Sequence, residues 1–216
     1  MTQANDRLTD VRQRIARMAK VAGRDPADIT LIAVSKTQPA EDIRPLLEAG
    51  HRDFGENRVQ EAEQKWPALK AEFPDVRLHM IGQLQSNKAA AAAALFDALH
   101  SVDRPSLVRA LGKIDMPPPV FLQVDVGEEA QKGGCPPADL PALRDLAADC
   151  RLNVRGLMCL PPAKREAAPY FALLARLAKD AGLEGLSMGM SGDFETAVQL
   201  GATHVRVGTA LFGPRP

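Results

Sequence analysis

The feature that most constrains the fold is an alternation of short apolar segments with helix-like segments along the 216 residues of the chain. The apolar segments are bounded by Gly, Pro, Asp or Ser, which is typical of buried strands. Many of the segments between them have apolar residues at three- and four-residue steps, and one is a run of alanines, which indicates helices. Strands that alternate with helices predict parallel pairing with right-handed crossovers, and therefore an α/β fold.

Eight strand–helix units can be counted. The predicted strands are residues 31–35, 51–54, 77–81, 98–102, 120–126, 154–158, 185–188 and 204–207. The predicted helices after them are residues 41–49, 58–70, 87–96, 104–112, 139–149, 165–181 and 193–200, with a short turn near Ala210. An extra N-terminal helix, residues 2–22, precedes the first strand.

Eight units close naturally into one (β/α)8 TIM barrel, which we predict to be a single domain over residues 1–216. A doubly wound open sheet uses the same units and remains the alternative. Against the open sheet, no Gly-x-Gly-x-x-Gly motif follows any predicted strand.

Composition excludes several classes of function. Lys and Arg (27) balance Asp and Glu (27), so there is no positive excess of the kind that nucleic-acid binding needs. The three cysteines lack CxxC spacing, and the four histidines (His51, His79, His100 and His204) lack metal-type spacing, so neither a disulfide framework nor a metal site is indicated. No apolar run reaches membrane-spanning length and no signal peptide is recognisable. We expect a cytoplasmic protein without a membrane or nucleic-acid partner.

A lysine stands at the end of the first predicted strand, in Leu31-Ile-Ala-Val-Ser-Lys36-Thr37. In a (β/α)8 barrel, functional groups lie at the carboxyl ends of the strands. A lysine there is a candidate amine for a Schiff base with an aldehyde. The alternative is a lysine whose ammonium simply reaches solvent.

Two glycine-containing motifs lie where a barrel commonly binds phosphate, after the seventh and eighth strands. Ser191-Gly192 immediately precedes the helix predicted over residues 193–200, which Ser191 or its neighbour can cap, and Gly208-Thr209 follows the last strand. Either motif alone is an ordinary cap or turn, but both together predict a phosphate cup. A phosphate cup and an imine-forming lysine favour a phosphorylated aldehyde, with pyridoxal phosphate (PLP) as the main candidate and a sugar phosphate as another.

Arg206 lies two residues before Gly208, so strand alternation places it on the same face, inside the barrel. A buried guanidinium beside a pyridine nitrogen would donate a hydrogen bond to it and keep it unprotonated. The alternative is a structural salt bridge with a carboxylate that lines the barrel, such as Glu56 or Asp125.

The sequence resembles the pyridoxal phosphate homeostasis protein family, relatives of the N-terminal barrel of alanine racemase. The resemblance covers nearly the whole chain and rests on six motifs in the family's order. They are residues 33–37 (AVSKT), 54–61 (FGENRVQE), 79–88 (HMIGQLQSNK), 156–158 (GLM), 186–195 (LSMGMSGDFE) and 205–213 (VRVGTALFG).

The resemblance implies a barrel of the alanine racemase N-terminal type that binds PLP. It implies that Lys36 carries the cofactor as a Schiff base, that Ser191, Gly192, Gly208 and Thr209 hold its phosphate, that Arg206 faces the pyridine nitrogen, and that Asn57 is a pocket residue.

The resemblance also implies a role in storing, buffering or delivering PLP, with PLP-dependent apo-enzymes as the expected recipients, without a clear enzymatic activity. Alanine racemase needs a second domain and a tyrosine acid/base contributed across a dimer. The one tyrosine here, Tyr170, is predicted in the helix before the seventh strand, away from the mouth of the barrel, and the chain ends just after the eighth strand. We therefore expect a monomer without catalytic residues, with a PLP-dependent racemase or related enzyme of low activity as the alternative.

Overall fold

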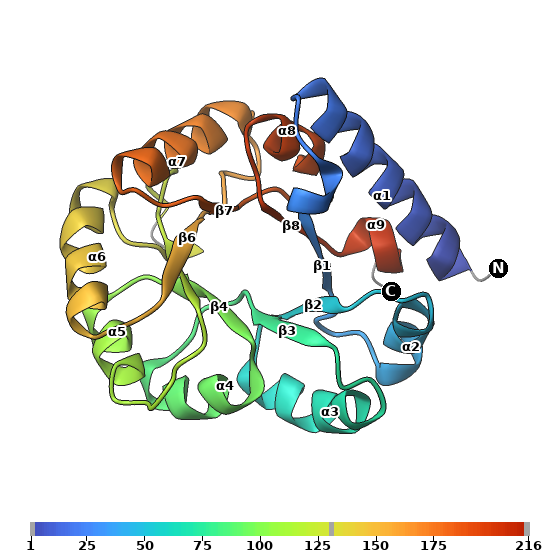
Figure 1. Ribbon diagram of the computed structural model, residues 1–216, viewed down its shortest axis with the longest axis horizontal. Helices are drawn as coiled ribbons and strands as arrows, with labels where there is room; N and C mark the ends of the chain where they lie inside the picture. Colours follow the sequence, from blue (N-terminus) through green and yellow to red (C-terminus); the bar gives the residue numbers. More distant parts are fainter. Residues whose placement is uncertain (1–2, 130–131, 214–216) are drawn as a thin grey trace.

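A computed structural model describes residues 3–129 and 132–213 as a closed barrel of parallel strands inside a ring of helices (Figure 1). The strands follow one another around the barrel in chain order from β1 to β8, and β8 pairs with β1. This confirms the predicted eight-stranded barrel, and the alternative of an open sheet is wrong. The bounds of the strands are β1 Thr30–Val34, β2 Asp53–Glu56, β3 Arg77–Met80, β4 Ala98–Val102, β5 Val120–Gln123, β6 Val154–Met158, β7 Gly185–Ser187 and β8 His204–Val207.

The helices cover the outside of the barrel. Their bounds are α1 Gln3–Val21, α2 Ala40–Glu48, α3 Val59–Glu72, α4 Ala89–Leu95, α5 Pro105–Leu111, α6 Leu140–Asp149, α7 Ala168–Asp180, α8 Phe194–Gln199 and α9 Thr209–Phe212. Short 3-10 helices occur at Pro26–Asp28, Ser86–Lys88 and Pro137–Asp139. The extra helix α1 packs against α8 and α9, beside the seam where the first and last strands pair (Figure 1).

Five of the eight predicted strands differ from the observed bounds, and two of them, the second and the fifth, miss an end by two or three residues for local reasons. The second strand begins at Asp53, because the backbone N–H of His51 still bonds to Leu46 O in the turn after α2. The fifth strand ends at Gln123, because Val124 forms only an isolated bridge with Cys135 in a returning loop. Within the described ranges, none of the helices is long and apolar enough to span a membrane.

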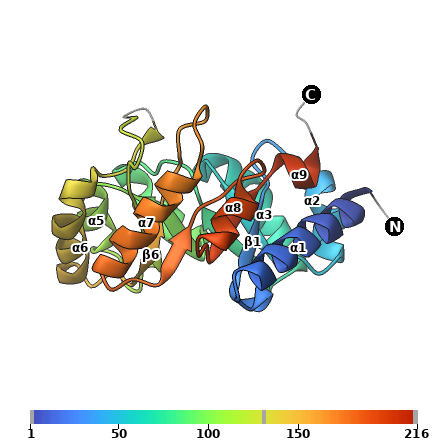
Figure 2. The same cartoon turned by 90° about the horizontal axis from the view of Figure 1, so that it is seen from above.

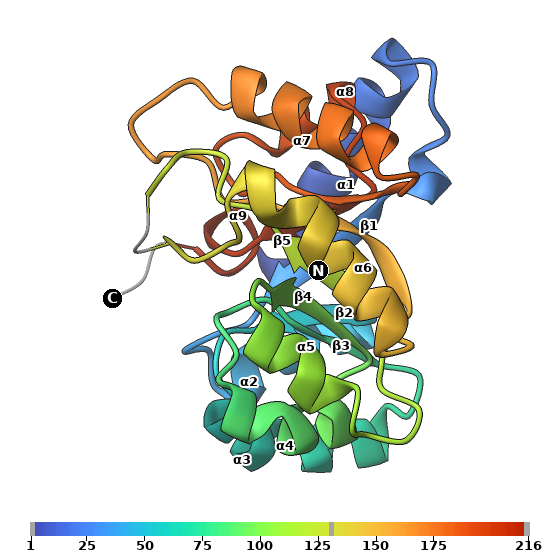
Figure 3. The same cartoon turned by 90° about the vertical axis from the view of Figure 1, so that its left-hand side faces the viewer.

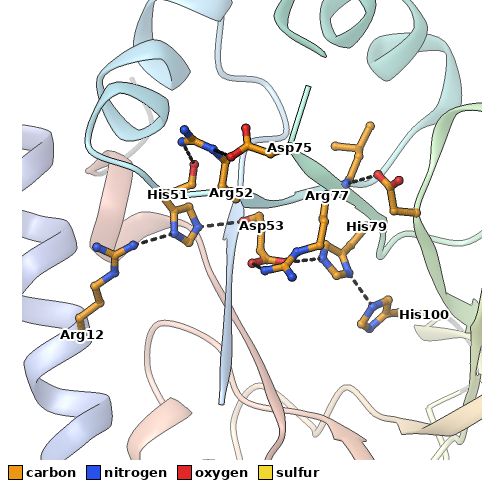
Figure 4. Close-up of polar contacts among 10 residues, drawn as sticks. Arg12, His51, Arg52, Asp53, Asp75, Arg77, His79 and His100 are labelled. Carbon is orange, nitrogen blue, oxygen red and sulfur yellow. Dashed lines mark hydrogen bonds and ion pairs between the residues drawn. The ribbon is translucent and has the colours of Figure 1, made fainter. Parts of the chain in front are cut away.

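The amino ends of the strands carry a cluster of charged and aromatic polar residues (Figure 4). His51, which is 4% exposed, places Nε2 2.8 Å from Asp53 O and Nδ1 3.4 Å from Nη2 of Arg12. Burial lowers the pKa of His51 to about 4, and the charge of Arg12 adds to the effect. The folded protein therefore holds this imidazole neutral.

We expect the free energy of unfolding to fall as the pH falls from 6.5 to 4. Above pH 6.5 His51 is neutral in both the folded and the unfolded state. Between pH 6.5 and about 4, His51 binds a proton in the unfolded chain but not in the folded protein. One such histidine costs on the order of 3 kcal/mol over this window. Urea unfolding across the window should show a smaller loss of stability for His51→Gln than for the wild type. Equal losses would show that His51 does not titrate in this way.

Candidate functional site

A cavity of about 450 Å³ opens at the carboxyl ends of the strands. Its lining comes from β1, β8 and α9 and from the loops after β5 and β6. Figures 2 and 3 show these loops and α9 at the same end of the barrel. All seven residues that the sequence singled out line this one cavity: Lys36, Asn57, Ser191, Gly192, Arg206, Gly208 and Thr209. The geometry brings them together, and their role in holding a cofactor remains a prediction.

Lys36 reaches the cavity because β1 alternates its side chains. Val34 and Lys36 both line the cavity, and Lys36 is half-buried. The next residue, Thr37, has φ 63°, which is uncommon for a threonine. This sharp reversal turns the chain directly after Lys36, two residues beyond the end of β1, and fixes the position of the Lys36 backbone.

A buried ion network behind β1 holds this reversal. Nζ of Lys65 on α3 donates to Ser35 O at 2.9 Å and Gln38 O at 3.1 Å, on either side of Lys36. The same ammonium lies 2.7 Å from Oε1 of Glu56, whose side chain is fully buried. The Thr37 N–H donates to Oε1 of Glu61 at 2.6 Å. The backbone that carries Lys36 is therefore clamped from outside the barrel.

The two predicted phosphate motifs contact each other directly. Oγ of Ser191 accepts hydrogen bonds from Gly208 N at 3.3 Å and Ala210 N at 3.4 Å. The expectation that Ser191 or its neighbour caps the helix after β7 is wrong, because α8 begins at Phe194 with Asp193 at its N-cap, and the Ser191 hydroxyl instead meets the start of α9. Backbone amides that converge with a hydroxyl at the start of a helix suit an oxyanion such as phosphate.

The two glycines of the cup are not required by the protein's own packing. A Cβ on Gly192 would meet no atom within 4 Å, and one on Gly208 would lie 3.4 Å from Cβ of Val34, an ordinary contact. Neither glycine has a positive φ. Without a side chain at these positions, a ligand can approach the backbone closely. Ligand binding therefore explains the two glycines, whereas the packing of the fold does not.

Arg206 is a buried cation whose partners are neutral. It is 3% exposed, and its guanidinium donates to Ser187 Oγ at 2.7 Å and to Cys159 O at 2.8 Å. Burial lowers the pKa of Arg206 from its ordinary value, yet a guanidinium stays protonated. Across residues 3–129 and 132–213 it forms no ion pair, so the cavity presents a positive donor to any electron-rich atom placed there.

The predicted alternative, a salt bridge from Arg206 to Glu56 or Asp125, is wrong. Glu56 ends β2 with its side chain outside the barrel, where Oε1 also accepts from Nε1 of Trp66 at 3.0 Å. Oδ1 of Asp125 accepts from the backbone amides of Gly127 and Glu129 in its own loop. Strand alternation explains the first error, since Asn57 and not Glu56 shares the inward face with the cavity.

Sequence reasoning missed several residues that line the cavity. The main ones are Lys132 from the loop after β5, Ile81 after β3, Leu160 and Pro161 after β6, and Phe212 on α9. Lys132 is held over the mouth by Nζ contacts with Pro161 O and Oε2 of Glu129, both 2.6 Å. Gly133 and Gly134 follow Lys132, and both have positive φ. This pair of glycines was the signal in the sequence that the loop after β5 has a specific conformation.

Tyr170 lies at the end of the barrel opposite to the one expected. It is near the amino end of α7, which follows β6, so its ring is on the same side as the cavity. It lines a separate depression of about 290 Å³ with Glu129, Pro162 and other loop residues. A phenol there is close to the mouth but outside the cavity that holds Lys36.

Comparison with known proteins first defines the class. A family model described as "Alanine racemase, N-terminal domain" matches residues 7–216, which fits a parallel barrel with its cavity at the carboxyl ends of the strands. A curated relative from Pseudomonas aeruginosa, "Pyridoxal phosphate homeostasis protein", is 46% identical and the alignment covers 100% of this chain and 97% of that protein. The chain belongs to the pyridoxal phosphate homeostasis protein family.

Solved structures agree with this assignment. PipY of Synechococcus elongatus, solved with PLP bound, is 40% identical with a TM-score of 0.77, covering 93% of this chain and 100% of that chain. Alanine racemase from Corynebacterium glutamicum is 22% identical with a TM-score of 0.66, and the match covers 95% of this chain but 61% of that one. The likeness to the racemase shows the fold alone.

Proposed function

We propose that this chain binds pyridoxal 5'-phosphate as a Schiff base on Lys36 and acts in intracellular PLP homeostasis by storing, buffering or delivering the cofactor. The observation that carries the proposal is that one cavity of about 450 Å³ gathers an amine, an oxyanion cup and a buried guanidinium whose hydrogen-bond acceptors among the described residues are neutral. The family and the PLP-bound PipY relative support the same cofactor.

Each residue has a role that follows from its chemistry. When bound, PLP supplies the aldehyde that condenses with the Lys36 amine. Ser191, Gly192, Gly208 and Thr209 hold the phosphate through backbone amides and hydroxyls, and Asn57 lines the wall of the cavity. Arg206 donates to the pyridine nitrogen and keeps it unprotonated, which weakens the ring as an electron sink.

The non-enzymatic role is part of the proposal. Two-base racemisation needs a second positioned acid/base, and Tyr170 lines a different depression from Lys36. A PLP-dependent racemase or related enzyme of low activity is the competing function. Apo-enzymes that receive PLP are the proposed partners, with the chain acting as a cytoplasmic monomer.

Titration of the purified protein with PLP tests the proposal. We expect one equivalent to bind, with an absorbance band of an imine, and we expect Gly208→Ala to bind about tenfold more weakly with the same or slightly higher stability. The added methyl fits against Val34 but occupies space needed by the phosphate. A wild-type protein that takes up no PLP would end the proposal, and an unchanged affinity for Gly208→Ala would remove Gly208 from the cup.

Exchange of the Cα hydrogen separates the two functions. The PLP-loaded protein is incubated with a panel of amino acids in deuterated solvent. We expect no deuterium at Cα of any amino acid in the panel from a chain that only carries the cofactor. Exchange that requires PLP would establish the enzymatic alternative.

A further inference from the structure

The interior of the barrel contains a continuous chain of polar side chains that runs from its amino end to Arg206. Oδ1 of Asp53 lies 3.0 Å from Nε2 of His79, and Nδ1 of His79 lies 3.1 Å from Nε2 of His100 (Figure 4). Nδ1 of His100 lies 2.8 Å from Oγ of Ser187, which accepts from Arg206 Nη1 at 2.7 Å. Branched apolar residues usually fill this space, so the polar chain is a departure from ordinary barrel packing.

The hydrogen-bond donors along this chain can be assigned from its two ends. The Asp53 carboxylate only accepts, so Nε2 of His79 carries a hydrogen and its Nδ1 accepts. Nε2 of His100 must then donate to His79, and Nδ1 of His100 must accept from the Ser187 hydroxyl. That leaves the lone pairs of Ser187 Oγ facing the Arg206 guanidinium, which only donates. Each of the four hydrogen bonds from Asp53 to Arg206 then has one donor and one acceptor.

The charge states of Asp53 and of His100 are compatible with this assignment of donors and acceptors. Two hydrogen bonds from Arg77, 2.8 Å and 2.5 Å long, keep Asp53 a carboxylate. Burial opposes the charge of Asp53, but the hydrogen bonds from His79 and Arg77 lower its pKa overall. Burial lowers the pKa of His100 well below its ordinary value, and the charge of Arg206 adds to the effect, so His100 is neutral.

Packing fixes the rings of the chain. Phe121 stacks on His100 with centroids 4.3 Å apart and an interplanar angle of 18°. Gly185 allows this, because a Cβ there would lie 2.8 Å from the Phe121 ring. His100 is fully buried and Ser187 is fully buried, so neither can exchange its partner for water. Within the described residues no group of three or more His, Cys, Asp or Glu side chains is arranged to hold a metal ion.

We infer that Asp53, His79, His100 and Ser187 form a positioning relay that fixes the Arg206 guanidinium as a hydrogen-bond donor to whatever heteroatom occupies the cavity. The relay gives Arg206 a neutral acceptor at Nη1 where a carboxylate would neutralise it. The cation stays available to the ligand while one of its nitrogens is anchored. The contact with the PLP ring rests on the proposed function, whereas the relay itself is a property of the protein without ligand.

Nitrogen-15 NMR of the histidine rings in the full-length, PLP-free protein tests the relay directly. We expect His79 and His100 each to carry one ring hydrogen, on Nε2, at neutral pH. Asp53→Asn weakens the first acceptor, so the ring signals of His100 should shift although its own contacts are unchanged. A doubly protonated His79, a hydrogen on Nδ1 of His100, or an unmoved His100 signal in Asp53→Asn would overturn the relay.

PLP titration then tests what the relay does to Arg206. Ser187→Ala removes the acceptor of Nη1, and we expect about a tenfold loss of PLP affinity with a shifted absorbance band, while Ser187→Thr restores both. His51 is a buried histidine at the amino end of the barrel that does not belong to the relay. His51→Gln should therefore leave the absorbance band unchanged. If the wild type binds PLP and Ser187→Ala binds it equally well with the same band, the positioning role is wrong. If the wild type binds no PLP, the proposed function fails and the NMR result still decides the relay.

Discussion

Lys36→Ala is expected to lose the covalent link to PLP completely. Borohydride reduces a Schiff base to a stable amine, so wild-type protein loaded with PLP and reduced should gain the mass of one pyridoxyl phosphate on Lys36. The variant should gain none, because an alanine at the end of β1 offers no amine. Intact mass and peptide mapping measure the result, and circular dichroism confirms that the variant is folded.

Lys132→Ala is the matched control, because Lys132 is the other described lysine that lines the cavity. This variant should keep the adduct on Lys36. An adduct that survives in Lys36→Ala, or one that maps to Lys132 in the wild type, would contradict the assignment. An adduct with the mass of a sugar phosphate in protein as purified would point instead to aldolase-like chemistry.

Glu56→Gln is expected to lower the free energy of unfolding by about 3 kcal/mol, since it removes the nearer and fully buried of the two carboxylates that pair with the Lys65 ammonium and leaves only Glu61, at 3.3 Å. The side chains of Lys65 and Glu56 are 9% and 0% exposed, and Oε1 of Glu56 accepts from Ser35 Oγ and Trp66 Nε1 as well. The loss should extend to PLP binding, because Lys65 clamps the backbone on both sides of Lys36. Urea unfolding and PLP titration measure the two effects.

Glu72→Gln provides the comparison for Glu56→Gln. Glu72 pairs with Arg44 on the surface, where the side chains are 49% and 40% exposed, so Glu72→Gln should change stability far less than Glu56→Gln and leave PLP affinity unchanged. Equal losses of stability in the two variants would show that the buried network contributes no more than a surface ion pair.

The sequence was sufficient for the barrel and for seven of the residues that line its cavity, but it missed others, such as Lys132 and Phe212. Strand and helix periods are local properties, so eight alternating units predicted the topology without any knowledge of long-range contacts. Lys36, Arg206 and Gly208 could be placed because strand alternation and the carboxyl-end rule assign side chains to a face. These positions needed no partner to be known.

The pairwise contacts could not be predicted in the same way. Ser191 was assigned to the nearest helix in the chain, but its hydroxyl contacts α9, which only the closure of the barrel brings close. Glu56 was predicted as a salt-bridge partner of Arg206, because a carboxylate and a cation that are both buried look complementary. The prediction fails because their side chains lie on opposite faces of the barrel wall. The relay joins strands β2, β3, β4, β7 and β8, and no spacing in the sequence encodes such a path.

Because β8 pairs with β1, the cavity lies between residues from the first and the last strand of the barrel. Lys36 comes from the first strand, whereas Arg206, Gly208 and Thr209 follow from the last, so a ligand that contacts both sets crosses the seam where the barrel closes. Such a ligand behaves as a reversible crosslink, and its binding free energy adds to the stability of the closed ring. A growing chain could form this site only after its eighth strand had joined the first, so occupancy of the cavity would report that folding is complete.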